Sequence, residues 1–131
     1  MKPRLLIVDD IVSVCEKLRD LLENEFEVVG LAGGGAEAIA LCEKHKPDLV
    51  LMDLVMPLMS GIEVTQQILA KVTPAPRVVI LSAIEEENTV IRALEAGAAE
   101  YLLKPVSESK IREVLKRVAS ENLEPEAEVE L

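Results

Sequence analysis

Five short apolar runs alternate with segments in which apolar residues recur every three or four positions. The runs comprise residues 4–8, 26–32, 48–53, 77–81 and 100–103. Their hydrophobicity is continuous rather than alternating, which is typical of strands buried on both faces, as in a parallel sheet. The segments that follow them fit amphipathic helices. The pattern predicts an α/β fold in which a five-stranded parallel, doubly wound sheet is flanked by five helices.

The predicted helices have recognisable ends and faces. They span about residues 14–22, 36–44, 62–72, 85–96 and 108–120. One face of the last helix carries Ile111, Val114, Leu115 and Val118. Ser107 precedes this helix and is the expected N-cap.

Polar side chains follow four of the five predicted strands. Asp9 and Asp10 come directly after the first strand, and Asp53 ends the third. Ser82 and Lys104 follow the fourth and the fifth. The carboxyl ends of parallel strands meet at one edge of the sheet, where ligands bind in open α/β folds, so we expect these residues to share a crevice. Asp53 alone would equally suit a helix cap, so the whole set indicates the site.

These residue types favour phosphoryl chemistry. Three neighbouring carboxylates repel one another unless a cation lies between them. An all-oxygen set suits Mg²⁺, which takes one or two carboxylates together with water and phosphate oxygens. A carboxylate can also act as a nucleophile and form an aspartyl phosphate. Lys104 supplies a compact positive charge for a phosphoryl group, and Ser82 supplies a hydrogen bond.

The strand-end residues and their neighbours resemble the receiver domain of bacterial two-component response regulators. The matching features are Val8-Asp9-Asp10, Met52-Asp53-Leu54-Val55-Met56-Pro57 with Gly61, Ser82-Ala83, Gly97-Ala98, Tyr101 and Lys104-Pro105. They occur in order over about residues 4–120. The resemblance implies a flavodoxin-like fold with strand order 2-1-3-4-5 and a crevice between strands one and three.

The resemblance also implies the roles of the acidic residues. Asp53 would be the phosphoacceptor, modified by a sensor histidine kinase or a phosphotransfer protein. Asp9 and Asp10 would hold Mg²⁺ together with Asp53 and the main-chain carbonyl of Val55. The protein would not be an enzyme in the ordinary sense, because it would promote only its own phosphorylation and dephosphorylation.

The remaining strand-end residues would connect the crevice to an output. Lys104 would pair with the phosphoryl group, and the bond from Lys104 to Pro105 would be cis. Ser82 would contact the phosphoryl group and act with Tyr101 as a switch pair. The switch would change the surface formed by the fourth helix, fifth strand and fifth helix, where phosphorylation could favour a homodimer.

Two kinds of output stay open. The chain is either the input part of a longer transcriptional regulator with a missing C-terminal domain, or a stand-alone module that acts by protein–protein contact. By the resemblance, Val55 and Ile84 flank the approach of water to the phosphoryl group. Both are stiff and apolar, so they either shield a long-lived phosphoprotein or only pack the loops.

A run of glycines offers a different interpretation. Residues 33–38, GGGAEA, fit G-x-G-x-x-A after a strand, and Asp53 follows about 20 residues on, as in a dinucleotide-binding domain. This remote alternative leaves Asp9, Asp10, Ser82 and Lys104 unexplained. A phosphatase with an aspartyl nucleophile is the other alternative, but it would generally place its first two acids two residues apart rather than side by side.

The chain departs from the receiver pattern beside the acidic pair. Ile11 and Val12 stand where acidic or polar residues are common, and Cys15 stands where Arg is common. The departures leave the phosphorylation chemistry intact and affect the surface that meets the kinase. Cys15 and Cys42 are expected as small buried apolar residues rather than a disulfide.

Charge is concentrated at the C-terminal end. Residues 121–131 hold five Glu and no Lys or Arg, half of the formal net charge of −10. We expect them to be an acidic linker or disordered tail behind one domain, residues 1–120. That domain has no basic stripe, so nucleic-acid binding by this segment is not expected. The lack of a signal peptide and of an apolar run near the roughly 20 residues of a membrane span favours a cytoplasmic protein.

Overall fold

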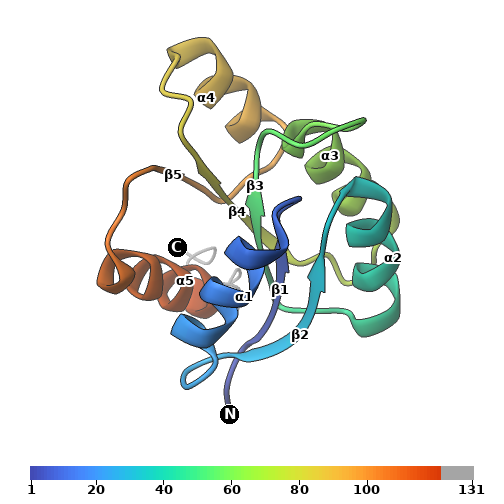
Figure 1. Ribbon diagram of the computed structural model, residues 1–131. Helices are drawn as coiled ribbons and strands as arrows, with labels where there is room; N and C mark the ends of the chain where they lie inside the picture. Colours follow the sequence, from blue (N-terminus) through green and yellow to red (C-terminus); the bar gives the residue numbers. More distant parts are fainter. Residues whose placement is uncertain (122–131) are drawn as a thin grey trace, which may run out of the picture.

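The computed structural model describes residues 1–121, in which strands and helices alternate along the chain (Figure 1). The elements are β1 (Arg4–Val8), α1 (Val12–Leu22), β2 (Glu27–Ala32), α2 (Gly35–His45), β3 (Leu49–Asp53), α3 (Gly61–Lys71), β4 (Arg77–Ser82), α4 (Glu87–Glu95), β5 (Glu100–Leu103) and α5 (Glu108–Glu121). Every predicted element is present, with ends shifted by at most two residues.

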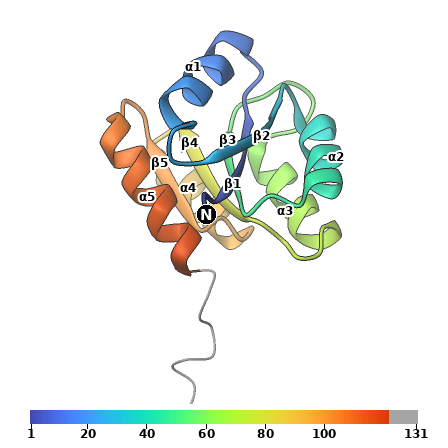
Figure 2. The same ribbon diagram turned by 90° about the horizontal axis from the view of Figure 1, so that it is seen from below.

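The strands form one parallel sheet in the order β2-β1-β3-β4-β5, which confirms the predicted fold. Helices α1 and α5 cover one face, and α2, α3 and α4 cover the other (Figure 2). The direction of winding reverses between the adjacent strands β1 and β3. The loops that leave these two strands therefore lead to opposite faces, and a crevice opens between them at the carboxyl edge of the sheet.

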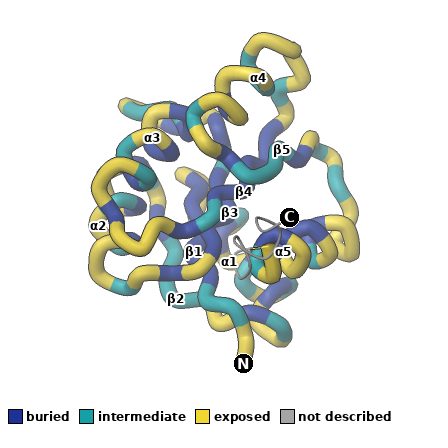
Figure 3. Tube along the Cα trace, turned by 180° about the vertical axis from the view of Figure 1, so that it is seen from behind, coloured by how far each residue is buried: buried dark blue, intermediate teal, exposed yellow. Residues whose placement is uncertain are grey.

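Two aliphatic cores lie on the two faces of the sheet. In β1, Leu6 and Val8 face one core, while Leu5 and Ile7 face the other. All four side chains are at most 1% exposed, and the central strands are dark along their length in Figure 3. Burial on both sides explains why the strands read as continuous apolar runs.

Local capping sets the start of two helices. At α3, Ser60 Oγ accepts a hydrogen bond from the Glu63 N–H, and the Glu63 side chain accepts one from the Ser60 N–H, which makes a capping box. At α5, Ser107 Oγ accepts the N–H of Lys110 at 3.1 Å, which confirms the predicted N-cap. These contacts fix where the preceding loops end.

Helix α4 is the least buried helix of the described chain. Ala93 is its only buried residue, whereas Ile91 and Leu94 are 43% and 45% exposed. Leu103 of the neighbouring strand β5 is also 43% exposed. Helix α4 therefore has fewer core contacts to hold it in one position than the other helices have.

The cysteines are free and buried, as predicted. Burial raises the pKa of the Cys42 thiol to about 12, so this side chain stays protonated at neutral pH. Helix α5 extends through Glu121, one residue into the segment expected as a tail, and residues 122–131 lie outside the described part. Over residues 1–121, the helices are too short or too polar to traverse a bilayer.

Candidate functional site

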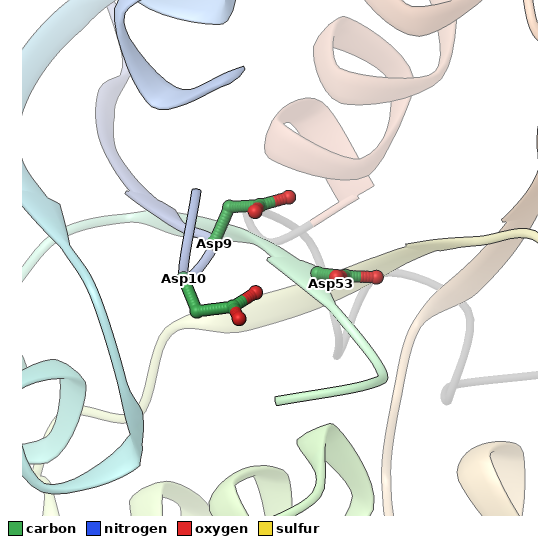
Figure 4. Close-up of side chains that lie close together, drawn as sticks. All are labelled: Asp9, Asp10 and Asp53. Atoms are coloured by element: carbon green, nitrogen blue, oxygen red, sulfur yellow. The ribbon is translucent and has the colours of Figure 1, made fainter. Parts of the chain in front are cut away.

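Three aspartates meet at the carboxyl edge of the sheet. Asp9 and Asp10 directly follow β1, and Asp53 is the last residue of β3. One carboxylate oxygen from each lies within 4.8 Å of the other two, and Figure 4 shows the three side chains together at the strand ends. The structure therefore brings together the acidic residues that the sequence placed at one edge.

The three carboxylates differ in their exposure to solvent. Asp9 is 4% exposed, Asp53 is partly buried, and Asp10 is exposed. Asp9 Oδ1 accepts a hydrogen bond of 2.9 Å from the N–H of Ile11, which fixes the direction of this carboxylate. The cluster thus has a buried inner acid and an outer acid that faces water.

Burial raises the pKa of the Asp53 carboxyl above its ordinary value. The positive charge of Lys104 opposes the rise, and the negative charge of Asp9 adds to it. Hydrogen bonds from the N–H groups of Val55 and Leu54 also favour the ionised form, but they are smaller effects. Asp53 is therefore an anion held where its charge is unfavourable, and a cation at the site would relieve this.

Lys104 is the positive group of the site. It follows β5, and its main-chain N–H donates to the carbonyl of Ser82 at 2.8 Å, which ties the ends of β5 and β4 together. Its Nζ lies 3.9 Å from Asp53 Oδ1. The peptide bond between Lys104 and Pro105 is cis, as expected. At this distance the ammonium group can pair with a ligand bound to Asp53.

The donor set fits Mg²⁺. All three side chains offer carboxylate oxygens, the ligands that this ion prefers, and the exposed Asp10 leaves an open side for water. With Mg–O distances of about 2.1 Å, two oxygens on one ion lie at most about 4.2 Å apart, so small side-chain rotations would close the cluster. The role of the Val55 carbonyl as a further ligand stays a prediction.

The two predicted switch residues both bond to the main chain of Ile84. Ser82 is fully buried, and its Oγ accepts the N–H of Ile84 at 3.0 Å. Tyr101 donates its hydroxyl proton to the carbonyl of Ile84 at 2.7 Å. The loop after β4 is therefore held at one residue from two sides. No motif in the sequence indicated this, because Ile84 takes part through its backbone alone.

Two glycines allow close packing around the site. A β-carbon on Gly61 would lie 2.7 Å from the carbonyl oxygen of Asp53, so only glycine fits there without a shift. A β-carbon on Gly35 would lie 2.7 Å from the Val64 side chain and 2.9 Å from Met59 Sδ. The glycine run that resembled a dinucleotide fingerprint thus has a packing reason at Gly35.

Comparison with known proteins gives one family. The response regulator receiver domain family matches residues 5–116. "Chemotaxis protein CheY" of Thermotoga maritima is 37% identical over 120 residues, covering 91% of this chain and 99% of that protein. "Transcriptional regulatory protein PdtaR" of Mycobacterium tuberculosis is 44% identical over 109 residues, covering 82% of this chain but 52% of that protein.

Solved structures agree with this assignment. The signal receiver domain of the putative response regulator NarL from Mycobacterium tuberculosis matches with a TM-score of 0.84 and 34% identity, over 91% of this chain and 97% of that one. A LuxR-family two-component response regulator from Aurantimonas matches with a TM-score of 0.86 and 30% identity, over 92% of this chain and 87% of that one. Sequence and fold thus lead to the same conclusion, and the chain belongs to the response regulator receiver domain family.

Proposed function

We propose that the chain is a phosphorylation-dependent signalling switch that accepts a phosphoryl group on Asp53 in a Mg²⁺-dependent reaction. The donor is a sensor histidine kinase or a phosphotransfer protein. The observation that carries the proposal is the meeting of three carboxylates and one lysine at the ends of β1, β3 and β5. Asp9, Asp10, Asp53 and the Val55 carbonyl are the groups that would hold the ion.

The chemistry follows from the charges at the site. A carboxylate oxygen of Asp53 attacks phosphorus, and the electron pair of the broken bond leaves with the donor. Lys104 pairs with a phosphoryl oxygen, and the buried hydroxyl of Ser82 donates to another. Bound Mg²⁺ supplies the positive charge that offsets the three carboxylates and the phosphoryl group. The chain promotes its own phosphorylation and dephosphorylation and has no other substrate.

The switch operates through Ile84. Ser82 accepts the Ile84 N–H, so its own proton is free to point at a phosphoryl oxygen. A shift of Ser82 towards that oxygen moves Ile84 and, through its carbonyl, Tyr101. Phosphorylation then shifts the population of arrangements of α4, β5 and α5, where α4 is loosely packed. The apolar residues exposed on α4 and β5 suit a homodimer or another partner.

Regulation of transcription through a further domain is the output that we favour, in the cytoplasm and with no direct nucleic-acid contact by this segment. The similarity to a transcriptional regulatory protein, of which the chain spans about half, supports it. A stand-alone module that signals by protein contact is the second candidate. The similarity to a chemotaxis protein that the chain covers almost completely supports that one.

The phosphorylation proposal is tested by intact mass after incubation with phosphoramidate and Mg²⁺. The parent should gain one phosphoryl group, whereas Asp53→Asn and a sample with excess chelator should gain none. Asp20→Asn, a change at an exposed α1 residue that pairs with Arg19, is the matched control and should react like the parent. Undiminished modification of Asp53→Asn would refute the assignment.

The output proposal is tested separately by NMR with beryllofluoride as the phosphoryl mimic. Amide chemical shifts of α4, β5 and α5 should change when the mimic binds, and Tyr101→Phe should reduce the change on α4. If binding shifts only the amides of the strand-end loops, the proposed switch surface is wrong.

A further inference from the structure

Cys15 lies beneath the loop that carries the acidic pair. Asp9 and Asp10 leave the end of β1 side by side (Figure 4), and α1 begins after one more residue, Ile11. Ile11 and the first helical residue, Val12, are 54% and 67% exposed, so they contribute little packing to the loop. Cys15 is 3% exposed and packs in the core between the sheet and helices α1 and α5. It is the first buried residue after Asp9.

The thiol of Cys15 holds the main chain of Asp9. Its Sγ lies 3.4 Å from the carbonyl oxygen of Asp9 and 3.8 Å from the carbonyl oxygen of Ala32, at the end of β2. The Ala32 carbonyl already accepts the N–H of Asp9 at 3.0 Å. The shorter distance and the existing bond at Ala32 both assign the thiol proton to Asp9. Cys15 thus ties α1 to the end of β1, beside β2.

Asp9 is held through its main chain and its side chain together. Its N–H donates to Ala32, its carbonyl accepts from Cys15, and its Oδ1 accepts the N–H of Ile11. Ile11 is the N-cap of α1 and makes no side-chain capping bond, so the thiol supplies the side-chain hydrogen bond from the first turns of α1 to the loop. The Asp9 carboxylate still has lone pairs for an ion, and the fixed main chain limits where they point.

We propose that Cys15 is a positioning residue for the candidate magnesium site, an inference that rests on the proposed function. Its S–H···O bond fixes the main chain of Asp9, and with it the spacing between the two acids of the loop and Asp53. Groups that orient metal ligands commonly change metal affinity by roughly 10- to 100-fold. A thiol is a weak donor, so the effect of Cys15 should lie near the lower end of that range or below it, at about three- to tenfold.

The test is a Mg²⁺ titration of the parent, Cys15→Ala and Cys15→Ser, followed through the amide chemical shifts of Asp10 and Ile11. The half-saturating Mg²⁺ concentration should rise about three- to tenfold in Cys15→Ala. Most of the loss should be recovered in Cys15→Ser, because a hydroxyl can donate the same hydrogen bond. Phosphorylation by phosphoramidate should need correspondingly more Mg²⁺ in Cys15→Ala, with little change in its rate at saturating Mg²⁺.

Cys42→Ala is the matched control. It makes the same truncation at a cysteine that is 0% exposed in the core on the other face of the sheet. Its half-saturating Mg²⁺ concentration should equal the parent's. Equal Mg²⁺ dependence in the parent and Cys15→Ala, or a Cys15→Ser variant as weak as Cys15→Ala, would overturn the role of the thiol while leaving phosphorylation of Asp53 intact. A parent that neither binds Mg²⁺ nor takes up a phosphoryl group would instead overturn the proposed function.

Infrared spectroscopy tests the hydrogen bond without any change at Cys15. The chain has two thiols, so Cys42→Ala leaves the S–H stretching band of Cys15 alone in the spectrum. A hydrogen-bonded thiol absorbs at a lower frequency than a free one. The Cys15 band should therefore lie below that of an alkanethiol in an apolar solvent, and saturation with Mg²⁺ should shift it, because the ion acts on Asp9. A band at the frequency of a free thiol, or one that Mg²⁺ leaves unmoved, would refute the proposal.

Discussion

Replacement of Asp53 by Asn should stabilise the Mg²⁺-free fold, because the native carboxylate is held at an electrostatic cost. Oxygens of Asp53 and Asp9 lie within 4.8 Å of each other. At an effective dielectric constant of about 20, two like unit charges at that separation repel by about 3.5 kcal/mol. Asparagine keeps the shape of the side chain and removes this repulsion.

Burial of the Asp53 carboxylate adds the largest cost to its ionised form, and the charge of Lys104 opposes both effects. Its Nζ is 3.9 Å from Asp53, which would give an attraction of about 4 kcal/mol in the same medium. However, the lysine side chain is 37% exposed, so water screens the pair towards the roughly 1 kcal/mol of surface ion pairs. The exposed Asp10 is screened in the same way. We expect a net gain for Asp53→Asn of about 1–3 kcal/mol at neutral pH.

The gain should depend on pH in a defined direction. The pKa of Asp53 in the native state is raised above 3.8, its value in the unfolded chain. At a pH between these two pKa values, the native state binds more protons than the unfolded state. The stability of the parent therefore falls as pH rises through this window. The gain in stability from Asp53→Asn should be complete at neutral pH. It should vanish as pH falls through the window, because the Asp53 side chain of the parent is then protonated and uncharged as well.

Thermal and urea unfolding with excess chelator measure the effect, and each kcal/mol should raise Tm by about 4 °C for a domain of this size. Asp20→Asn is the control and should stay within about 0.5 kcal/mol of the parent. Added Mg²⁺ should stabilise the parent more than Asp53→Asn, because the variant lacks one ligand. A variant no more stable than the parent, or a gain that grows towards acid pH, would contradict the electrostatic argument.

Three further predictions concern the residues around the crevice. The double change Val55→Asn and Ile84→Glu should speed the loss of phosphate after donor removal by roughly tenfold or more, because polar side chains can position an attacking water. An unchanged rate of loss would mean that apolar shielding does not set the lifetime of the phosphoprotein. Tyr101→Phe should lower the stability to urea by about 1 kcal/mol, since the Ile84 carbonyl loses its donor; no loss would indicate that water replaces the hydroxyl. Gly35→Ala should lower Tm by the equivalent of about 1–3 kcal/mol through overpacking, whereas Gly34→Ala, whose β-carbon would meet nothing within 4 Å, should be close to neutral.

The sequence by itself determined the fold class and the membership of the site. A strand made of continuous apolar residues is stable only where both of its faces are buried. Strands that are each followed by a crossover helix run parallel to one another. All strand ends then lie at one edge, so Asp9, Asp53 and Lys104 had to share that edge, and the strand order decides how near one another they are. The strand order did not follow from periodicity, since many orders satisfy it. It came from the family resemblance, and the sheet confirms it.

Tertiary structure alone decided how each group behaves. Asp9 and Asp10 are neighbours in the sequence, yet one is buried and the other faces solvent, because consecutive side chains point in different directions at a strand end. The convergence of two hydroxyl side chains on Ile84 involves backbone groups, which every residue has and no motif reveals. The cleft that Arg92 of α4 lines together with Val55 of the β3–α3 loop likewise depends on tertiary packing, because these segments are far apart in the chain.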